Sequence, residues 1–406
     1  MSFNIALTGL NASNEDLSVT SNNLANAATV GFKGSRTEFS DLFASTSTGV
    51  SATAVGNGVA VSEVAQQFTQ GNIETTGNNL DLAVNGNGFF ITSDNGALQY
   101  TRDGEFQLNA DNQIVNAAGQ ALQGYPALAN GTFNQGGLSD ISLTTTQSSP
   151  QATTTAQLTA NLPADATPPT DAPFSPTDAN SYNETTSLTV YDSLGAAHTA
   201  SLYFINTGEN TWNAALYIDG TEVGTPQALD YTDTGQLETP ADGNLSFGAY
   251  TPATGAAPMN TTFNFSNTTQ YGDTFGVTAV QQNGYTTGQL SGINIDSSGV
   301  VQAQFTNGNS VNLGQVAIAN FANPQGLQQL GNASWAATNE SGAPVNGVAG
   351  NSGFGSIESG SLEESNVNTT SALVEMITAE RNFQANAQMI QTDDQVTQSI
   401  IDIRGS

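Results

Sequence analysis

The first thirty residues carry large apolar side chains at a helical spacing. Phe3, Leu7, Leu10, Leu17 and Leu24 follow one another in steps of four, three, seven and seven. Such steps place the side chains on one seam of a heptad helix. Polar residues occupy the two remaining seam positions, so this segment would form only a marginal helix by itself.

The last forty residues repeat the pattern, and neither Gly nor Pro interrupts residues 361–404. The seam contains Leu373, Met376, Phe383, Ala387, Ile390 and Ile401, and Ile377 flanks it. Ser361 and Glu364 have the spacing of a capping box, which would start the helix there, although a start near Thr370 fits equally well. We interpret Glu363 and Glu364 as the polar first turn of this helix.

Two matching helices at opposite ends of one chain have each other, or copies of themselves, as natural partners. We therefore predict a terminal coiled-coil domain formed by residues 1–30 and 362–406. Because the seams are impure, we expect the ends to be poorly ordered in the monomer and to gain their packing in a polymer. The apolar seam residues are the predicted polymer interface.

Between the ends, the apolar period changes from helical spacing to alternation, which is typical of half-buried strands. We predict a connector at residues 31–70, in which the uncharged, Ser/Thr/Gly-rich residues 44–62 form a long connector or a loosely paired hairpin. An inner β domain is expected from residues 71–145 and 284–361. A Pro-rich stretch then introduces an inserted outer β barrel or sandwich at residues 146–283. The predicted fold class is therefore multidomain and mainly β, with antiparallel β domains nested between paired terminal helices.

Local signals predict individual hairpins in both β domains. The turn sequence Asn85–Gly88 predicts that the strand before it pairs with the strand that begins at Phe89. The residues from Trp212 to Ile218 alternate between apolar and polar side chains, which indicates a strand with one buried face. Residues 206–210 are expected to form a five-residue hairpin loop before it.

Charge is distributed very unevenly along the chain. The chain has five basic and 35 acidic residues, and none of the five basic residues lies between Asp103 and Glu380. Nucleic acid and anionic membrane surfaces need Lys and Arg, so neither is an expected partner. No stretch of 18 apolar residues could span a membrane, and the absence of Cys excludes disulfides and thiolate metal sites.

Candidate chemistry is sparse. The single histidine, His198, would have to serve any Ser–His–Asp triad, but the sequence lacks a G-x-S-x-G motif. Loops such as Asp242–Asn244 do not have the spacing of an EF-hand. A pair of carboxylates acting on glycans stays an alternative, with Glu363 and Glu364 as its most conspicuous members. We expect a protein without catalytic residues, cofactor or metal.

Several segments resemble the signatures of the flagellar rod and hook axial protein family. The first has Asn22, Asn23, Leu24 and Asn26 followed by Gly31, Phe32 and Lys33. Further segments occur in the family's order over about half of the chain, namely residues 71–90, 100–106, 123–125, 360–367 and 381–387. The resemblance adds Asn22, Asn23, Asn26 and Phe32 to the predicted interface of the N-terminal helix.

Within this family, residues 191–204 resemble a motif of hook-type members, and rod-type members lack a large middle domain. The resemblance thus implies a hook subunit that polymerises into a bendable tube, connects rod to filament and transmits torque. A distal rod subunit is the first alternative. An unrelated acidic, secreted β-rich adhesin is the second, although it would not need heptads at both ends.

The resemblance also implies partners and a location. The partners would be further copies of the chain in a helical polymer, the hook cap protein, the distal rod protein, the hook–filament junction protein and the flagellar type III export apparatus. The location would be the hook of the bacterial flagellum, outside the cell. Residues 1–13 contain no basic start or long apolar run, so export would proceed without a cleaved signal peptide.

Overall fold

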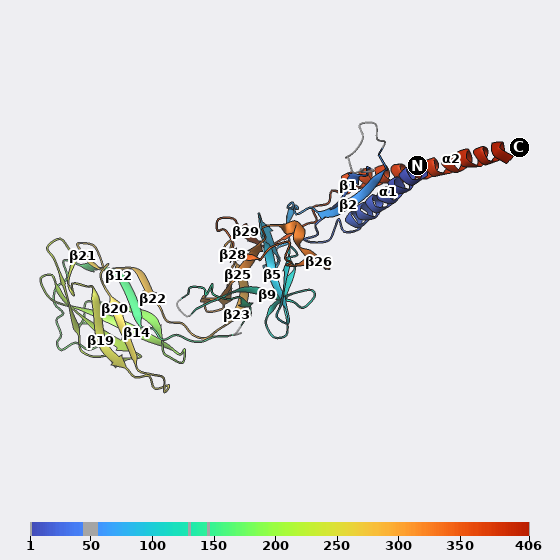
Figure 1. The fold of residues 1–406 in the computed structure, drawn as a ribbon. Helices are drawn as coiled ribbons and strands as arrows, with labels where there is room; N and C mark the ends of the chain where they lie inside the picture. The colour runs from blue at the N-terminus through green and yellow to red at the C-terminus, as the bar shows by residue number, and fades with distance from the viewer. Residues whose placement is uncertain (1, 44–55, 129–130, 144–146, 406) are drawn as a thin grey trace. The chain divides into compact units, whose positions relative to one another are not determined.

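The computed structural model describes residues 2–43, 56–128, 131–143 and 147–405, and the chain divides into two compact units. Unit 1 comprises Met1–Thr144, Ile293–Ala303 and Val311–Ser406, and unit 2 comprises Thr145–Gly292 and Gln304–Ser310. Nearly all elements of the described chain are strands, and a long helix lies at each end (Figure 1). The predicted mainly β fold with paired terminal helices is confirmed.

The two helices, α1 (Ser2–Ala25) and α2 (Thr369–Gly405), pack against each other. The start of α2 agrees with the later of the two predicted positions. The backbone N–H of Ser371 donates to Asn368 Oδ1 at 3.0 Å, so Asn368 caps the helix. Ser361 lies in a strand, and the predicted capping box is therefore wrong.

An antiparallel hairpin lies beside the helices and packs on α1. Its strands are β1 (Ser35–Asp41) and β2 (Val59–Gln66), with a bulge between Glu38 and Phe39. The sequence predicts a connector or a loosely paired hairpin here. The described residues form a paired hairpin, and residues 44–55 of the predicted segment lie outside the described part of the chain.

Thirteen strands form the largest sheet, whose main order is β11-β23-β24-β25-β9-β5-β6-β27-β26. Two further pairs, β4 with β29 and β3 with β30, are separate two-stranded sheets. The strands are β3 (Ile73–Thr75), β4 (Leu82–Asn85), β5 (Phe89–Asp94), β6 (Ala97–Thr101), β7 (Phe106–Leu108), β8 (Ile114–Asn116), β9 (Ala121–Pro126), β10 (Ser139–Asp140), β11 (Gln147–Ser148), β23 (Gly288–Ile295), β24 (Val300–Phe305), β25 (Ser310–Asn320), β26 (Gln328–Gly331), β27 (Ser334–Ala336), β28 (Val345–Val348), β29 (Ser356–Ser359) and β30 (Ser361–Glu363).

The predicted hairpin at Asn85–Gly88 is wrong, although the turn exists. β4 pairs with β29, and β5 pairs with β6, β9 and β25, so the strands on either side of the turn belong to different sheets. Gly86 and Gly88 have positive φ angles of 112° and 131°, which glycine adopts without strain. The sequence signal therefore marks a sharp turn but not the partner of either strand.

Unit 2 contains two sheets, one with five strands and one with six. The five-stranded sheet is β12 (Thr155–Pro163), β19 (Asn244–Tyr250), β20 (Met259–Asn264), β21 (Thr269–Tyr271) and β22 (Gly276–Gln282). The six-stranded sheet is β13 (Glu184–Tyr191), β14 (Ala197–Gly208), β15 (Thr211–Ile218), β16 (Thr221–Glu222), β17 (Gln227–Tyr231) and β18 (Leu237–Thr239). The five-stranded sheet is mixed, because β12 runs parallel to β20 and β21.

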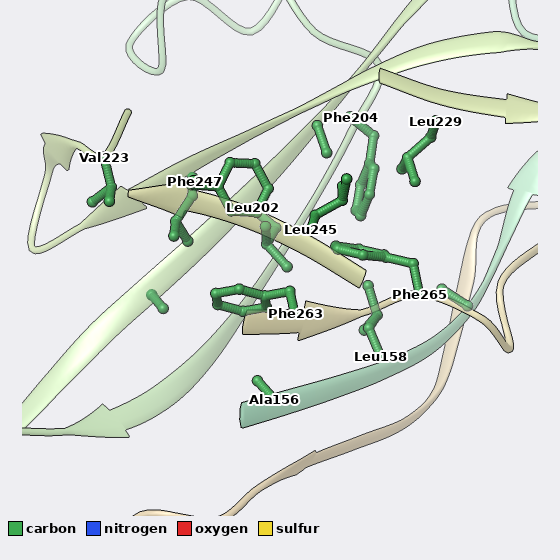
Figure 2. Packing of buried hydrophobic residues seen from close by; sticks show 14 of the residues in the cluster. Ala156, Leu158, Leu202, Phe204, Val223, Leu229, Leu245, Phe247, Phe263 and Phe265 are labelled. Atoms are coloured by element: carbon green, nitrogen blue, oxygen red, sulfur yellow. The ribbon is translucent and has the colours of Figure 1, made fainter. Parts of the chain in front are cut away.

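One apolar core lies between these two sheets, with aromatic and aliphatic side chains from both (Figure 2). Leu158 of β12 meets Phe204 of β14 and Phe263 of β20 in this cluster. The predicted alternation in β15 is confirmed, since Trp212 and Ile218 are both buried. The predicted five-residue loop is wrong, because β14 continues to Gly208 and only two residues separate it from β15.

Candidate functional site

The contact between the terminal helices is made mainly by small side chains. Ala6 on α1 and Ala379 on α2 are buried, with exposed fractions of 1% and 0%. A Cβ atom added at Gly9 would lie 2.7 Å from the side-chain oxygen of Asn386, so the backbone of α1 approaches α2 closely there. Asn386 Nδ2 also donates to Ser13 Oγ at 3.4 Å. The helices therefore pack closely because Gly and Ala occupy their contact.

Several predicted seam residues lie outside this contact. Phe3 and Leu7 are 40% and 39% exposed, and Leu373, Ile377 and Ile401 are 44%, 48% and 61% exposed. The remaining members of the seam are half-buried; they are Leu10, Leu17, Leu24, Met376, Phe383, Ala387 and Ile390. The heptad prediction thus identifies the apolar positions, but the buried contact within the chain falls on smaller neighbours.

The second helix is longer than the first, with 37 residues against 24. Figure 1 shows α2 continuing past the N-terminal end of α1. Further large apolar side chains on α2 are at least half exposed, namely Val374, Met389, Val396 and Ile400. Large apolar side chains that stay exposed on a helix are candidates for an interaction surface.

The predicted interface asparagines make contacts within their own chain. Asn23 is buried, its Nδ2 donates to the carbonyl of Ser35 at 2.6 Å, and its Oδ1 accepts from the Ser35 N–H at 2.8 Å. Asn26 Nδ2 donates to the carbonyl of Asn22 at 2.9 Å, which closes the end of α1. Phe32 is half-buried in the following turn. Asn23 fixes the start of β1, so its side chain is not free to contact another subunit.

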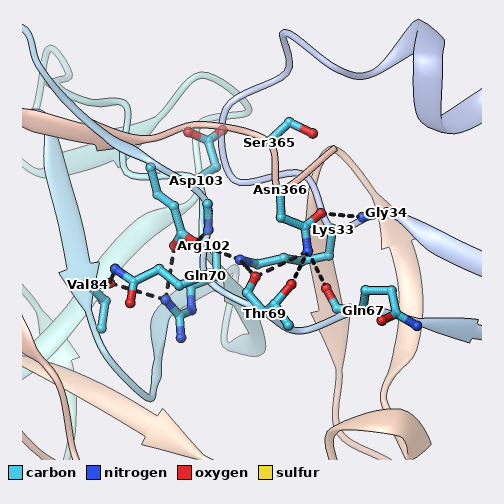
Figure 3. A network of polar contacts seen from close by, with 12 residues as sticks. Lys33, Gly34, Gln67, Thr69, Gln70, Val84, Arg102, Asp103, Ser365 and Asn366 are labelled. Atoms are coloured by element: carbon cyan, nitrogen blue, oxygen red, sulfur yellow. Dashed lines mark hydrogen bonds and ion pairs between the residues drawn. The ribbon is translucent and has the colours of Figure 1, made fainter. Parts of the chain in front are cut away.

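A buried ionic cluster joins three distant parts of unit 1. Glu363 of β30 is fully buried and accepts from Lys33 Nζ at 2.6 Å and from Arg102 Nη1 at 3.0 Å. The Gly71 N–H donates to the same carboxylate at 2.8 Å. Figure 3 shows Lys33 and Arg102 within one network of polar contacts that also includes Thr69 and Gln70. Glu363 thereby connects the chain after α1, the start of the β body and the strand before α2.

The cluster contains two cations and one carboxylate, and backbone carbonyls supply the remaining acceptors. Lys33 Nζ donates to the carbonyl of Thr69 at 2.8 Å, and Arg102 Nη2 donates to that of Gly86 at 2.7 Å. The guanidinium also lies 5.4 Å from the ring centre of Phe89. Burial lowers the pKa values of Lys33 and Arg102, although the charge of Glu363 opposes both shifts.

Asn366 extends the connection toward α2. Its Oδ1 accepts from the Gly34 N–H at 2.8 Å, and its Nδ2 donates to the carbonyl of Gln67 at 2.6 Å (Figure 3). Three residues earlier in the chain, Glu363 is anchored through β30, which pairs with β3. The prediction that Glu363 belongs to a helix is therefore wrong, and sequence reasoning missed its role.

Asp103, next to Arg102, is expected to make the stability of unit 1 depend on pH. Burial raises the pKa of Asp103 to about 6, with smaller contributions from the charges of Glu105 and Asp81. A raised carboxyl pKa means that the folded state binds the proton more tightly than the unfolded state. Protonation of Asp103 should therefore stabilise unit 1 by on the order of 1 kcal/mol as pH falls from 7 to 4, with allowance for partial exposure.

The variant Asp103→Asn isolates this effect, since its amide oxygen can still accept the Glu105 N–H. Urea unfolding of unit 1 between pH 7 and pH 4 should show a smaller gain in stability on acidification for Asp103→Asn than for the unchanged chain. Asp111→Asn, at an exposed turn, serves as the control and should behave like the unchanged chain. Identical pH profiles for all three proteins would contradict the assignment.

His198, the candidate catalytic base, is held between two carboxylates. Its Nδ1 lies 2.6 Å from Asp219 Oδ2, and its Nε2 lies 3.3 Å from Asp192 Oδ2. Both ring nitrogens are therefore engaged, and neither contacts a serine hydroxyl. Within the described ranges, no group of three or more His, Cys, Asp or Glu residues is arranged to hold a metal ion. The geometry favours a structural role for His198.

Four family models match parts of the chain. Residues 3–33 match "Flagella basal body rod protein", and residues 83–167 match "Flagellar hook protein FlgE/F/G D1 domain". Residues 157–285 match "Flagellar basal body protein FlaE D2 domain", and residues 358–403 match "Flagellar basal body rod FlgEFG protein C-terminal". These matches include both terminal helices and most of unit 2.

Full-length relatives extend the comparison. The chain is 39% identical to the flagellar hook protein FlgE of Escherichia coli K12 and 38% identical to that of Salmonella typhimurium LT2, and each alignment covers 100% of both chains. The flagellar hook protein of Brucella suis is 30% identical, over 98% of this chain and 97% of its own. Alignment over these whole lengths favours the hook interpretation over the distal rod and adhesin alternatives.

The fold also resembles a solved structure. The crystal structure of Helicobacter pylori flagellar hook protein FlgE2 aligns with a TM-score of 0.51 at 14% identity, over 70% of this chain and 99% of that one. Neither helix in the described part of the chain is long and apolar enough to cross a membrane. The chain belongs to the flagellar hook protein FlgE family, and it is a structural subunit of the bacterial flagellar hook.

Proposed function

We propose that the exposed apolar side chains of the terminal helices form the contacts between subunits in the hook polymer. The observation that carries this proposal is the exposure of large apolar residues on both helices after the helices have packed together. The proposed interface consists of Phe3, Leu7, Leu10, Leu17, Asn22, Leu24, Asn26 and Phe32 with Leu373, Met376, Ile377, Phe383, Ala387, Ile390 and Ile401. Asn23 leaves the set because its side chain is buried and both ends of its amide bond to Ser35 within the chain.

A polymer forms when the contacts between subunits repeat from one copy to the next without closing into a ring. Burying these side chains against neighbouring helices removes apolar surface from water, at roughly 25 cal/mol per Å². In the proposed polymer the contact between helices of neighbouring subunits is heterologous and does not close into a ring, which is the arrangement that generates a helical filament. The filament would be a tube that bends, couples rod to filament and transmits torque.

The domain organisation is part of the same proposal. We assign residues 1–30 and 369–406 to the polymerising helical domain, 31–70 to a connector, 71–145 and 284–368 to an inner β domain, and 146–283 to an outer inserted domain. The boundary predicted at residue 362 moves to 369, because β30 pairs with β3 and α2 begins at Thr369. The boundaries of unit 2 at residues 145 and 292 support the inserted domain. Residues 145–292 contain no Lys or Arg, so copies of this domain cannot form Lys or Arg salt bridges with one another, and polar contacts between them can exchange readily.

The proposed partners follow from the family. They are the hook cap protein, the distal rod protein, the hook–filament junction protein and the flagellar type III export apparatus. The proposed location is extracellular, after export without a cleaved signal peptide. Neither nucleic acid nor insertion into a membrane has a place in this function, and catalysis and cofactors are not part of it.

The variants Ile377→Asp and Ile401→Asp test the interface. Both side chains are about half exposed or more, so the monomer should keep its helix content and unfolding transition. A buried carboxylate in the polymer would be strongly unfavourable, and we expect the critical concentration for polymerisation to rise more than about tenfold. Sedimentation of polymer at increasing protein concentration measures this value, and circular dichroism checks the monomer.

Gln388→Glu is the matched control, because it places a negative charge on an exposed polar position of the same helix. It should polymerise nearly as well as the unchanged chain. Equal critical concentrations for all of these proteins would overturn the proposed interface, while leaving membership of the hook family unaffected.

A further inference from the structure

His198 joins three loops at one end of unit 2. It lies near the start of β14, directly after the turn that contains Asp192. Asp219 lies in the turn after β15 and adopts a positive φ of 50°. Tyr250, at the end of β19, stacks edge-on against the imidazole with ring centres 5.7 Å apart. The imidazole is therefore surrounded by two carboxylates and one phenol, which are the titratable groups that face it.

The buried carboxylate of Asp192 is the centre of this arrangement. Its Oδ1 accepts from the backbone N–H groups of Leu194 and Ala196, both at 2.9 Å. Its Oδ2 accepts from Thr254 Oγ1 at 2.8 Å in addition to the contact with His198. The side chain of Asp192 is 0% exposed. Asp192 thus ties the turn after β13 to the loop after β19, and His198 completes the connection.

Asp219 holds the other side of the ring. Its Oδ1 accepts from the Thr199 N–H at 2.9 Å, and its Oδ2 accepts from Tyr250 OH at 3.3 Å. A protonated imidazole donates from both nitrogens, so it satisfies both carboxylates at once. A neutral imidazole has one N–H, and its other nitrogen would direct a lone pair at a carboxylate oxygen. The geometry therefore favours the charged form of His198.

The turn after β13 lies against the segment that precedes β12 and the segment that follows β22. A Cβ atom added at Gly195 would lie 2.8 Å from Pro150 Cβ and 3.3 Å from the Cα of Thr286. Next to these contacts, Gln151 and Tyr285 exchange two backbone hydrogen bonds of 3.0 Å. The turn therefore packs closely against both connecting segments.

We propose that His198 is a proton-controlled latch that holds the turn of residues 192–196 against the connecting segments 147–151 and 284–288. The latch is closed while the imidazole is protonated and loosens when the proton is lost. It is the only cationic side chain available within residues 145–292, because that stretch contains no Lys or Arg. Loss of its charge therefore cannot be compensated by another cation in unit 2.

The direction of the pH effect follows from the contacts. Burial alone would lower the pKa of His198, but the hydrogen bonds and charges of Asp219 and Asp192 outweigh it and raise that pKa above its usual value of 6.5. Stability from this contact is fully present below pH 6.5 and is lost as pH rises through the raised pKa. Between pH 6.5 and the raised pKa of His198, the ratio of open to closed latch should increase about tenfold per pH unit.

The test uses the full chain, in which His198 is the single histidine, so its imidazole NMR signals need no assignment. We expect His198 to titrate above pH 6.5. Hydrogen exchange, corrected for the intrinsic rate, should show loss of protection at residues 192–197 and 284–288 between pH 6.5 and pH 8.5. Residues 227–231, on β17, should show no change and serve as the internal control.

Two variants separate the latch from a general effect of pH. His198→Gln should abolish the pH dependence of protection at residues 192–197. Asp219→Asn acts at a side chain that is 42% exposed, so it should fold normally and lower the pKa of His198. The proposal is overturned if His198 of the unchanged chain titrates at or below pH 6.5. It is equally overturned if protection is independent of pH, or if Asp219→Asn leaves the titration unchanged.

Discussion

Replacing Glu363 with Gln is expected to lower the free energy of unfolding of unit 1 by about 3–5 kcal/mol. The change leaves Lys33 and Arg102 buried without a counter-charge, while both keep their backbone acceptors. Removing one member of a buried ionic group is costly because the remaining charges lose their compensation but regain no water. The effect should be confined to unit 1, since the whole cluster lies within it.

The two tryptophans make this measurement specific. Trp335 belongs to an apolar cluster of unit 1, and Trp212 belongs to the core of unit 2. Urea unfolding followed by Trp335 fluorescence, in a chain that carries Trp212→Phe, reports unit 1 alone. Glu364→Gln changes the neighbouring exposed carboxylate and should alter stability by less than about 0.5 kcal/mol. If the two Gln variants were equally stable, the cluster would not anchor unit 1.

Replacing Phe204 with Ala should destabilise unit 2 by about 3–5 kcal/mol and leave unit 1 unchanged. Phe204 is 1% exposed, and its ring packs edge-on against Phe265 with centres 6.2 Å apart. The variant loses this apolar burial and leaves a cavity between the two sheets, which cannot collapse fully around it. Since the proposed polymer contacts lie on the terminal helices, polymerisation should survive this loss.

Fluorescence of Trp212 in a Trp335→Phe background follows the unfolding of unit 2, and sedimentation follows the polymer. Tyr203→Ala provides a matched control on the adjacent position of β14, where the ring is only half-buried. Tyr203→Ala should lower the free energy of unfolding of unit 2 clearly less than Phe204→Ala does. Loss of polymer in Phe204→Ala at a temperature where unit 1 stays folded would show that unit 2 contributes essential contacts.

Those features of the fold that depend on local periodicity could be predicted from the sequence. The alternation from Trp212 to Ile218 indicates a strand with one buried face because strand side chains alternate strictly. Both terminal helices follow from heptad spacing in the same way. The apolar positions of the candidate interface, such as Ile377 and Ile401, could also be identified, since a helix places regularly spaced residues on one side.

Features that depend on distant pairing could not be predicted. Glu363 meets Lys33 across 330 positions of the sequence, and nothing local distinguishes it from the exposed Glu364 beside it. The turn at Asn85–Gly88 likewise reveals a change of direction, whereas the partners of β4 and β5 come from elsewhere in the chain. On the terminal helices, the spacing identifies the apolar residues. It does not reveal that α1 and α2 approach closely at Gly9, and so it cannot tell which apolar side chains stay exposed.

The central claim is that the apolar residues left exposed on the terminal helices join the subunits of the hook. Electron cryomicroscopy of the polymer formed by the full chain tests this most directly. The account predicts that Leu7, Ile377 and Ile401 are buried against helices of neighbouring subunits, around the axis of a tube. A reconstruction in which these side chains face solvent, and the β units alone connect the subunits, would contradict it.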